Sequence, residues 1–231
     1  GLYKLDEIIG GGIPVGRIIE FFGPEGGGKT TLAKEVIKAF QKHAEKKLCL
    51  FEDFEHAFDL EYAEKIGVNL SKEKWMFSQP TSLEEGADIL GVMAYTGKVG
   101  LAVVDSVAAM TPKAELEGEM SKDTMGGQAR GMGKLFRKLV GASKKNECTV
   151  AFINQVRDKI GMVWGNPETT PGGRALKFYA SIRIRVSSKK SKEIDGALEI
   201  KLKVVKNKTS SNQGGECNYV LIPGEGFKRN Y

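Results

Sequence analysis

The sequence has few cysteines and histidines and no long apolar segment. Its three cysteines are odd in number and widely spaced, so they indicate neither a disulfide framework nor a zinc site, and we expect buried thiols in a reducing cytoplasm. With only two histidines, a transition-metal centre has almost no support. No apolar run approaches the roughly 18 residues that cross a bilayer, and the N-terminus lacks the pattern of a signal peptide. We therefore expect a soluble cytoplasmic protein without a membrane partner.

The chain has a modest excess of positive charge. Its 35 Lys and Arg residues against 29 Asp and Glu give a formal charge of +6, which favours a polyanionic partner if the excess is clustered. The 231 residues, 41% of them hydrophobic, suffice for one sizeable core, and we expect a single domain over residues 1–231. The chain begins at Gly1 rather than Met, so we expect it to be part of a longer protein.

The hydrophobic pattern is typical of an α/β domain. Short β-branched runs alternate with longer segments of helical period, which predicts a mostly parallel, doubly wound sheet. The expected strands of this part are residues 17–22, 48–52, 75–78, 101–107 and 149–154. The expected helices are residues 30–44 and 83–95 and a segment around Leu135, Phe136 and Leu139.

The last third of the chain has a different pattern. Residues 181–186, 198–205 and 217–222 read as strands without intervening helices, which predicts an antiparallel extension at one edge of the sheet. Two connections, residues 111–125 and 156–174, are too long for simple turns. Connections of that length in a compact domain are usually functional or disordered.

A glycine-rich segment between the first expected strand and helix matches the G-x-x-x-x-G-K-[ST] phosphate-loop pattern. Its residues are Gly23, Pro24, Glu25, Gly26, Gly27, Gly28, Lys29 and Thr30, with Thr31 next. Glycines allow backbone N–H groups to turn inward around phosphate oxygens, and the start of the helix adds partial positive charge. Lys29 is expected to reach the β- and γ-phosphates of ATP, and the Thr30 hydroxyl to ligate Mg²⁺.

Carboxylates at strand ends are candidates for the remaining chemistry. Asp105 ends the apolar run at 101–104 and has the position of a Walker B carboxylate, which holds the water shell of the magnesium ion. Glu52, Asp53 and Glu55 follow the second expected strand. One of these three carboxylates could polarise an attacking water, and a solvated acidic loop is the alternative. The residues alone do not choose among them.

Several further stretches resemble the bacterial RecA recombinase family. They are VDSVAAMTPKAE (104–115), INQVR (153–157), GNPETT (165–170), GG (172–173), ALKFYAS (175–181) and KVVKNK (203–208). The resemblance runs from about residue 5 to residue 227 with matching order and spacing. It implies a RecA-type P-loop ATPase core, cellular or phage-encoded, without the family's N-terminal oligomerisation helix and small C-terminal domain.

The resemblance also implies residue roles. It makes Glu55 the catalytic carboxylate, Gln155 the sensor of the γ-phosphate, and Asp59 and Tyr62 contacts of adenine. Lys206 and Lys208 are expected to stabilise transition-state charge on the ATP of a neighbouring subunit, much as an arginine finger does. The same subunit interface is expected to include Phe178.

The two long connections match the family's DNA-binding loops. Basic, glycine and apolar residues in or beside them suit phosphate contacts and base stacking. The expected DNA-binding residues are Met125, Arg130, Arg137, Arg157, Lys159, Trp164, Gly172, Gly173 and Arg174. For Trp164, burial under the loop is the alternative.

The function implied is that of a DNA-dependent ATPase and recombinase. Such a protein binds ATP and Mg²⁺, forms a helical filament on single-stranded DNA, and exchanges strands with homologous double-stranded DNA. An alternative keeps the fold as an ATP-switched DNA-binding or regulatory protein without strand exchange. A P-loop kinase is disfavoured because the C-terminal third consists of strands ending in a paired-lysine motif rather than an Arg-rich lid.

Overall fold

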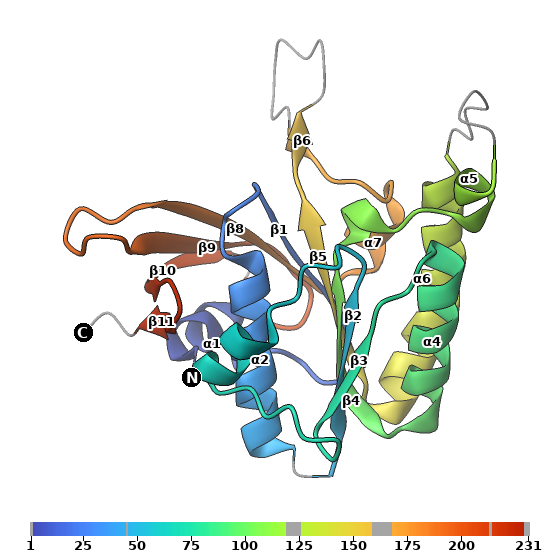
Figure 1. The fold of residues 1–231 in the computed structure, drawn as a ribbon, viewed down its shortest axis with the longest axis horizontal. Coiled ribbons are helices and arrows are strands. Elements are labelled where there is room, and N and C mark those ends of the chain that lie inside the picture. The colour runs from blue at the N-terminus through green and yellow to red at the C-terminus, as the bar shows by residue number, and fades with distance from the viewer. Residues whose placement is uncertain (1, 45, 119–125, 159–167, 213, 229–231) are drawn as a thin grey trace.

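The computed structural model describes residues 2–44, 46–118, 126–158, 168–212 and 214–228 (Figure 1). A nine-stranded sheet runs through the molecule in the order β11-β10-β9-β8-β1-β5-β4-β2-β3. Its strands are β1 (Ile18–Gly23), β2 (Leu48–Asp53), β3 (Trp75–Ser78), β4 (Val99–Asp105), β5 (Thr149–Gln155), β8 (Ile182–Lys190), β9 (Leu198–Asn207), β10 (Gly215–Ile222) and β11 (Gly226–Lys228). A separate two-stranded sheet pairs β6 (Arg157–Asp158) with β7 (Glu168–Thr169).

Helices cover both faces of the parallel part of the sheet (Figure 1). One face carries α1 (Tyr3–Ile9), α2 (Lys29–His43) and α3 (Leu60–Ile66). The other carries α4 (Leu83–Thr96), α6 (Gly127–Asn146) and α7 (Ala175–Tyr179). A 3₁₀ turn, η1 (Val107–Ala109), and the short helix α5 (Lys113–Leu116) lie between β4 and α6. The expected doubly wound architecture is confirmed.

The two-sided covering follows from the residue pattern of the strands. In β4, Leu101 and Val103 pack into the hydrophobic cluster beneath α2, while Ala102 and Val104 pack into the cluster beneath α4 and α6. Successive side chains of a strand point to opposite faces, so a continuous apolar run buries both. The expected strand at 101–107 nevertheless ends at Asp105, because Val107 already belongs to η1.

The C-terminal strands form the expected extension. β8 pairs parallel with β1, and β9, β10 and β11 then follow in antiparallel pairs. The sequence analysis did not anticipate α1, α3, α5, α7, β6, β7 or β11. Each of these has seven residues or fewer, too short for a distinct periodic pattern. Among the described residues, no helix is long and apolar enough to span a bilayer.

The sheet topology gathers the candidate chemistry at one edge. β1, β5, β4 and β2 are mutually parallel neighbours, so their carboxyl ends share one side of the sheet. The phosphate loop follows β1, Asp105 ends β4, and Gln155 ends β5. In such sheets, ligands bind in the crevice beyond the carboxyl ends of the strands.

Candidate nucleotide site and nucleic-acid interface

The phosphate loop adopts the conformation that its glycines permit. Gly28 caps the start of α2 with a φ of 85°, in the left-handed region that side chains rarely adopt. At Gly23, a Cβ atom would lie 1.9 Å from the Val186 carbonyl oxygen of β8, so only glycine fits between the strands. The Lys29 ammonium folds back across the loop and donates to the Pro24 carbonyl at 2.6 Å.

The loop forms one wall of a cavity of about 270 Å³. Its lining combines residues of five chain segments: Glu25, Gly26, Gly27, Gly28, Lys29, Thr30, Thr31, Glu55, Asp105, Gln155 and Leu221. The Thr30 hydroxyl donates to Asp105 Oδ2 at 2.7 Å, which pairs the two predicted magnesium ligands. Burial raises the pKa of Asp105 to about 6, and burial lowers the pKa of Lys29. A bound cation would restore the ionised form of this carboxyl.

The three carboxylates that the sequence left open have separate surroundings. Glu55 lines the cavity, and its Oε1 accepts hydrogen bonds from the Ser106 hydroxyl and from Gln155 Nε2, the latter at 3.1 Å. Asp53 is buried and accepts from Phe58 N at 3.0 Å and Gln79 Nε2 at 3.2 Å. Glu52 is fully buried on the side facing α4. Only Glu55 therefore has the exposure and position to contact a water in the cavity.

Ser106 is a contact that the sequence analysis missed. It directly follows Asp105, and its hydroxyl reaches across from the end of β4 to Glu55 after β2. The pairing of β2 with β4 brings the two segments together, with Asp53 in register with Asp105. A hydroxyl next to a Walker B carboxylate is the signal that could have suggested it.

Gln155 connects the cavity to the second long connection. It ends β5 and shares the cavity with Lys29. The next residue, Val156, donates its N–H to the Gly23 carbonyl at 3.3 Å, and β6 begins at Arg157. Gln155 is therefore one residue before the start of the segment expected to bind DNA, so a displacement of its side chain occurs next to that segment.

The predicted adenine contacts lie beside a second cavity of about 360 Å³. Asp59 caps α3 by accepting from Tyr62 N at 2.8 Å, and the Tyr62 hydroxyl is 3.2 Å from the Thr31 hydroxyl of the phosphate loop. The opposite wall is formed by Leu221, Pro223 and Gly224, which the sequence analysis did not select. Leu221 lines both cavities, so the two are adjacent.

The ammonium of Lys34 packs against the face of the Tyr62 ring. Its ammonium lies 4.5 Å from the centroids of the Phe58 and Tyr62 rings and donates to the Asp59 carbonyl at 3.1 Å. Cation–π contacts of this kind hold an aromatic ring in a defined orientation. The Lys34 side chain is buried, and the sequence pattern did not single it out.

The predicted DNA-binding residues fall into three groups. Met125, Lys159 and Trp164 lie outside the described residues. Gly172 and Gly173 pack near the start of α6, where a Cβ on Gly173 would meet Ala129 at 2.9 Å; Arg130 is exposed on α6 and Arg174 is exposed at the start of α7. Arg137 is exposed two turns further along α6, and Arg157 is exposed on β6.

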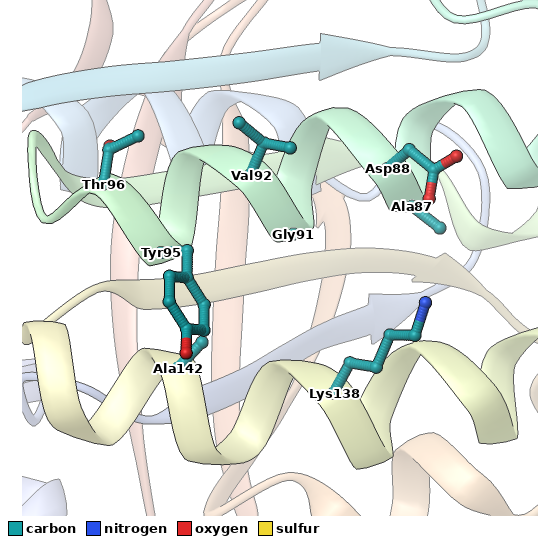
Figure 2. Close-up of a pocket in the computed structure, with 8 residues that line it drawn as sticks. All are labelled: Ala87, Asp88, Gly91, Val92, Tyr95, Thr96, Lys138 and Ala142. Carbon is teal, nitrogen blue, oxygen red and sulfur yellow. The ribbon is translucent and has the colours of Figure 1, made fainter.

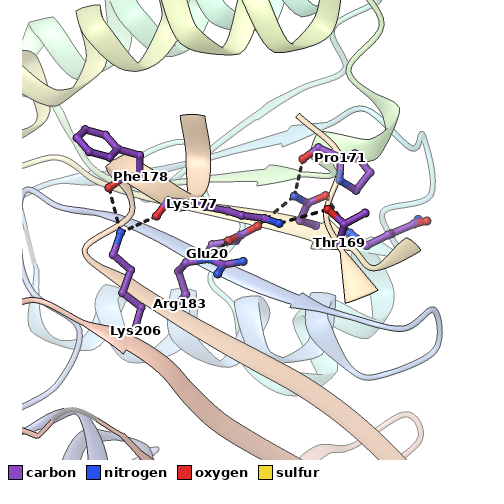
Figure 3. A network of polar contacts seen from close by, with 9 residues as sticks. Glu20, Thr169, Pro171, Lys177, Phe178, Arg183 and Lys206 are labelled. Atoms are coloured by element: carbon purple, nitrogen blue, oxygen red, sulfur yellow. Dashed lines mark hydrogen bonds and ion pairs between the residues drawn. The ribbon is translucent and has the colours of Figure 1, made fainter. Parts of the chain in front are cut away.

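Of the predicted interface residues, Lys206 and Phe178 lie together at the end of α7 (Figure 3). The Lys206 ammonium donates to the carbonyls of Lys177 at 2.5 Å and Phe178 at 2.9 Å, at the end of α7. The Lys208 ammonium lies 5.5 Å from the centroid of the Phe178 ring, which is 69% exposed. Burial, together with Lys208 and Arg183, lowers the pKa of Lys206 to about 8. Neither lysine lines the cavity of its own chain.

A larger cavity of about 680 Å³ lies between α4 and α6 (Figure 2). Its walls are mostly small and apolar, with Val92 58% and Tyr95 70% exposed. Asp88 and Lys138 are the charged members of its lining. Within the described residues it contains neither a glycine-rich loop nor a hydroxyl–carboxylate pair, so it does not suit a nucleotide.

Comparison with known proteins places this geometry in a family. The sequence profile of the RecA N-terminal domain matches residues 1–227. The chain belongs to the RecA family. The protein named RecA from Mesoplasma florum is 50% identical over 214 residues, which are 91% of this chain and 63% of that protein. This RecA-family chain thus spans less than two thirds of that relative.

The fold of this RecA-family chain is also found in a solved structure. The crystal structure of the RadB recombinase superposes with a TM-score of 0.70 and covers 96% of this chain and 94% of its own. At 20% sequence identity, this likeness concerns the fold. The expected family and fold class are confirmed.

Proposed function

We propose that this RecA-family chain is the ATP-binding core of a DNA recombinase. It hydrolyses ATP with Mg²⁺ in a DNA-dependent manner, self-associates into a filament on single-stranded DNA and exchanges strands with homologous double-stranded DNA. Support comes from membership of the RecA family and from 50% identity to a protein named RecA. The proposal treats residues 1–231 as the single ATPase core of that activity.

The observation that carries the proposal is the position of Gln155. Its amide donates to Glu55 inside the cavity that Lys29 lines, and the chain leaves that cavity directly into the second long connection. A side chain in this position senses whether the cavity is filled and is covalently joined to the segment expected to grip DNA.

The cavity suits ATP and Mg²⁺ by its donor set. The backbone N–H groups at the start of α2 and the Lys29 ammonium would bind the β- and γ-phosphates. The Thr30 hydroxyl and Asp105 carboxylate, already 2.7 Å apart, would hold the cation. Bound Mg²⁺ would supply neutralisation of the charge that develops on the phosphates. Asp59 and Tyr62 would contact adenine in the adjacent cavity.

Glu55 is the group proposed to orient the attacking water. Its Oε1 is engaged by Ser106 and Gln155, which fixes the plane of the carboxylate at the mouth of the cavity. Orientation of the nucleophile is a main contribution that protein groups make to phosphoryl transfer, because the loose transition state needs little covalent chemistry. Ser106 would act through Glu55 as a positioning residue.

Lys206 and Lys208 are proposed to act on a neighbouring chain. Lys206 is in register with Arg183 of β8 and hence with Glu20 of β1, three residues before the phosphate loop, and does not reach its own cavity. The exposed ring of Phe178 beside these lysines is suited to a contact between copies of the chain. The site would therefore be complete only in the assembled filament.

Single-stranded DNA is proposed to bind where the two long connections return to the domain. Gly172 and Gly173 pack there against η1 and the start of α6, and Arg130, Arg137, Arg157 and Arg174 are exposed. Phosphate contacts from these side chains release counterions, so DNA affinity should fall steeply with salt concentration. Met125, Lys159 and Trp164 are proposed as further DNA-binding residues.

The test is ATP turnover by the 231-residue chain with and without single-stranded DNA, for the wild type and for Lys29→Ala. Wild-type turnover should rise with DNA, and the variant should lose on the order of 100-fold or more, since one preorganised charge contact to the transition state contributes that much. Lys42→Ala, at an exposed position of the same helix, is the control. Undiminished turnover in Lys29→Ala would remove the phosphate-loop assignment. Filaments without joint molecules would indicate an ATP-switched DNA-binding protein instead.

A further inference from the structure

Gln128 makes an unusual set of contacts at the start of α6. Its Nε2 donates to the Val107 carbonyl at 2.8 Å and to the Met110 carbonyl at 3.0 Å. Its Oε1 accepts from the Gly172 N–H at 3.2 Å. One side chain thus uses both donors and its acceptor on backbone groups from two other segments. Neither the sequence analysis nor the proposed function assigns it a role.

Gln128 joins segments that lie next to the nucleotide cavity and to both long connections. Val107 is the first residue of η1 and Met110 directly follows it; η1 begins two residues after Asp105 and one after Ser106, the partner of Glu55. Met110 also leads into the first long connection. Gly172 closes the second long connection, whose other end begins beside Gln155. The amide of Gln128 therefore lies where the nucleotide cavity and both connections converge.

Close packing makes this junction stiff. Gly172 has a φ of 83°, and a Cβ there would lie only 2.8 Å from Val107 Cγ1, so the backbone rests directly on η1. From the side of the sheet, Asn154 Nδ2 donates to the Pro171 carbonyl at 3.1 Å. Asn154 is fully buried and is the neighbour of Gln155 on β5. Pro171 and Gly172 are thus held both from β5 and from α6.

We propose that Gln128 is a positioning residue that makes the ends of the two DNA-binding segments respond together to the nucleotide cavity. The proposal rests on the function proposed above. A primary amide is required because two carbonyl oxygens need donors while the Gly172 N–H needs an acceptor. Glutamate keeps the acceptor but sets a second oxygen against two carbonyls, and methionine has nearly the same shape without either function.

The experiment compares the wild-type chain with Gln128→Met and Gln128→Glu, and uses Lys145→Met at the exposed far end of α6 as the control. Affinity for a non-hydrolysable ATP analogue is measured first and should stay within about twofold, because Gln128 does not line the cavity. Amide hydrogen exchange is then followed with and without the analogue. In the wild type and the control, the analogue should change protection at residues 107–112 and 168–174 together.

In Gln128→Met, the response at 168–174 should be lost while the response at 107–112 remains. In Gln128→Glu, both should weaken. The analogue-dependent affinity for a single-stranded oligonucleotide should fall at least about tenfold in Gln128→Met, because this variant loses all three hydrogen bonds of the amide. An unchanged joint response in Gln128→Met, or no response in the wild type, overturns the inference. If the ATP analogue does not change the affinity of the wild-type chain for the oligonucleotide, the proposed function is contradicted instead. The hydrogen-exchange data still decide the role of Gln128 in that case.

Discussion

Glu52 offers a quantitative test of the tertiary structure. It is 0% exposed on β2, and neither carboxyl oxygen has a hydrogen-bond partner. Its carboxyl group lies against Gly86 of α4, where a Cβ would be 3.2 Å from Oε2. Burial, and secondarily the charge of Glu85, raises the pKa of Glu52 to about 8. The folded protein therefore holds this carboxyl group in its neutral form at pH 7.

The sign and size of the effect follow from linkage. The folded pKa is raised above the unfolded value of 4.5, so the folded state retains a proton that the unfolded chain releases. Stability therefore falls as pH rises from about 4.5 and levels off above about 8, with a slope near 1.4 kcal/mol per pH unit between. At pH 7 the cost is about 1.36 × (7 − 4.5), or roughly 3 kcal/mol.

Two substitutions separate ionisation from hydrogen bonding. Glu52→Gln removes the pH-dependent part of the destabilisation. Glu52→Leu also removes the unsatisfied polar atoms, which should raise the free energy of unfolding by roughly 1–3 kcal/mol more. In urea denaturation from about pH 5 to about pH 8, the free energy of unfolding of both variants should increase relative to that of the wild type as pH rises. Glu73→Gln, at an exposed position, should leave the wild-type slope intact. A Glu52→Leu variant less stable than the wild type at pH 7, or with the same slope, would refute this account.

Three further predictions concern the site. Glu55→Gln should bind ATP but turn it over at least about 100-fold more slowly, the scale of general base catalysis, in single-turnover measurements; rapid turnover would point to Asp53. Lys206→Ala with Lys208→Ala should slow turnover in assembled protein only, because the two charges are expected to act on the ATP of a neighbouring chain; an equal loss in monomers would exclude action in trans. Arg185 binds Glu168 of β7 through two hydrogen bonds of 2.9 and 2.5 Å, so Arg185→Ala should release that strand and weaken DNA binding about tenfold; if the losses of Arg185→Ala and Glu168→Gln simply add in the double variant, the pair does not contribute.

Local patterns in the amino-acid sequence were enough to predict those parts of the protein that form within one segment of the chain. The phosphate loop is one contiguous run, because its glycines, lysine and threonine all act on a ligand within reach of a single turn and helix start. The alternation of buried strands and amphipathic helices likewise depends on periodicity within each segment, and it predicted the doubly wound sheet and its antiparallel extension. The motifs of the RecA family added the order of the sites along the chain.

Contacts between residues of different segments depend on how the strands and helices pack in three dimensions. The sequence does not distinguish the carboxylates of Glu52, Asp53 and Glu55. Strand alternation buries Glu52 against α4, whereas the turn of the chain after β2 brings Glu55 into the cavity. The pairing of β2 with β4 brings Ser106 to Glu55. The packing of η1 on Gly172 lets the side chain of Gln128 contact both η1 and Gly172. These contacts depend on register and packing between segments up to about a hundred residues apart, which no local pattern encodes.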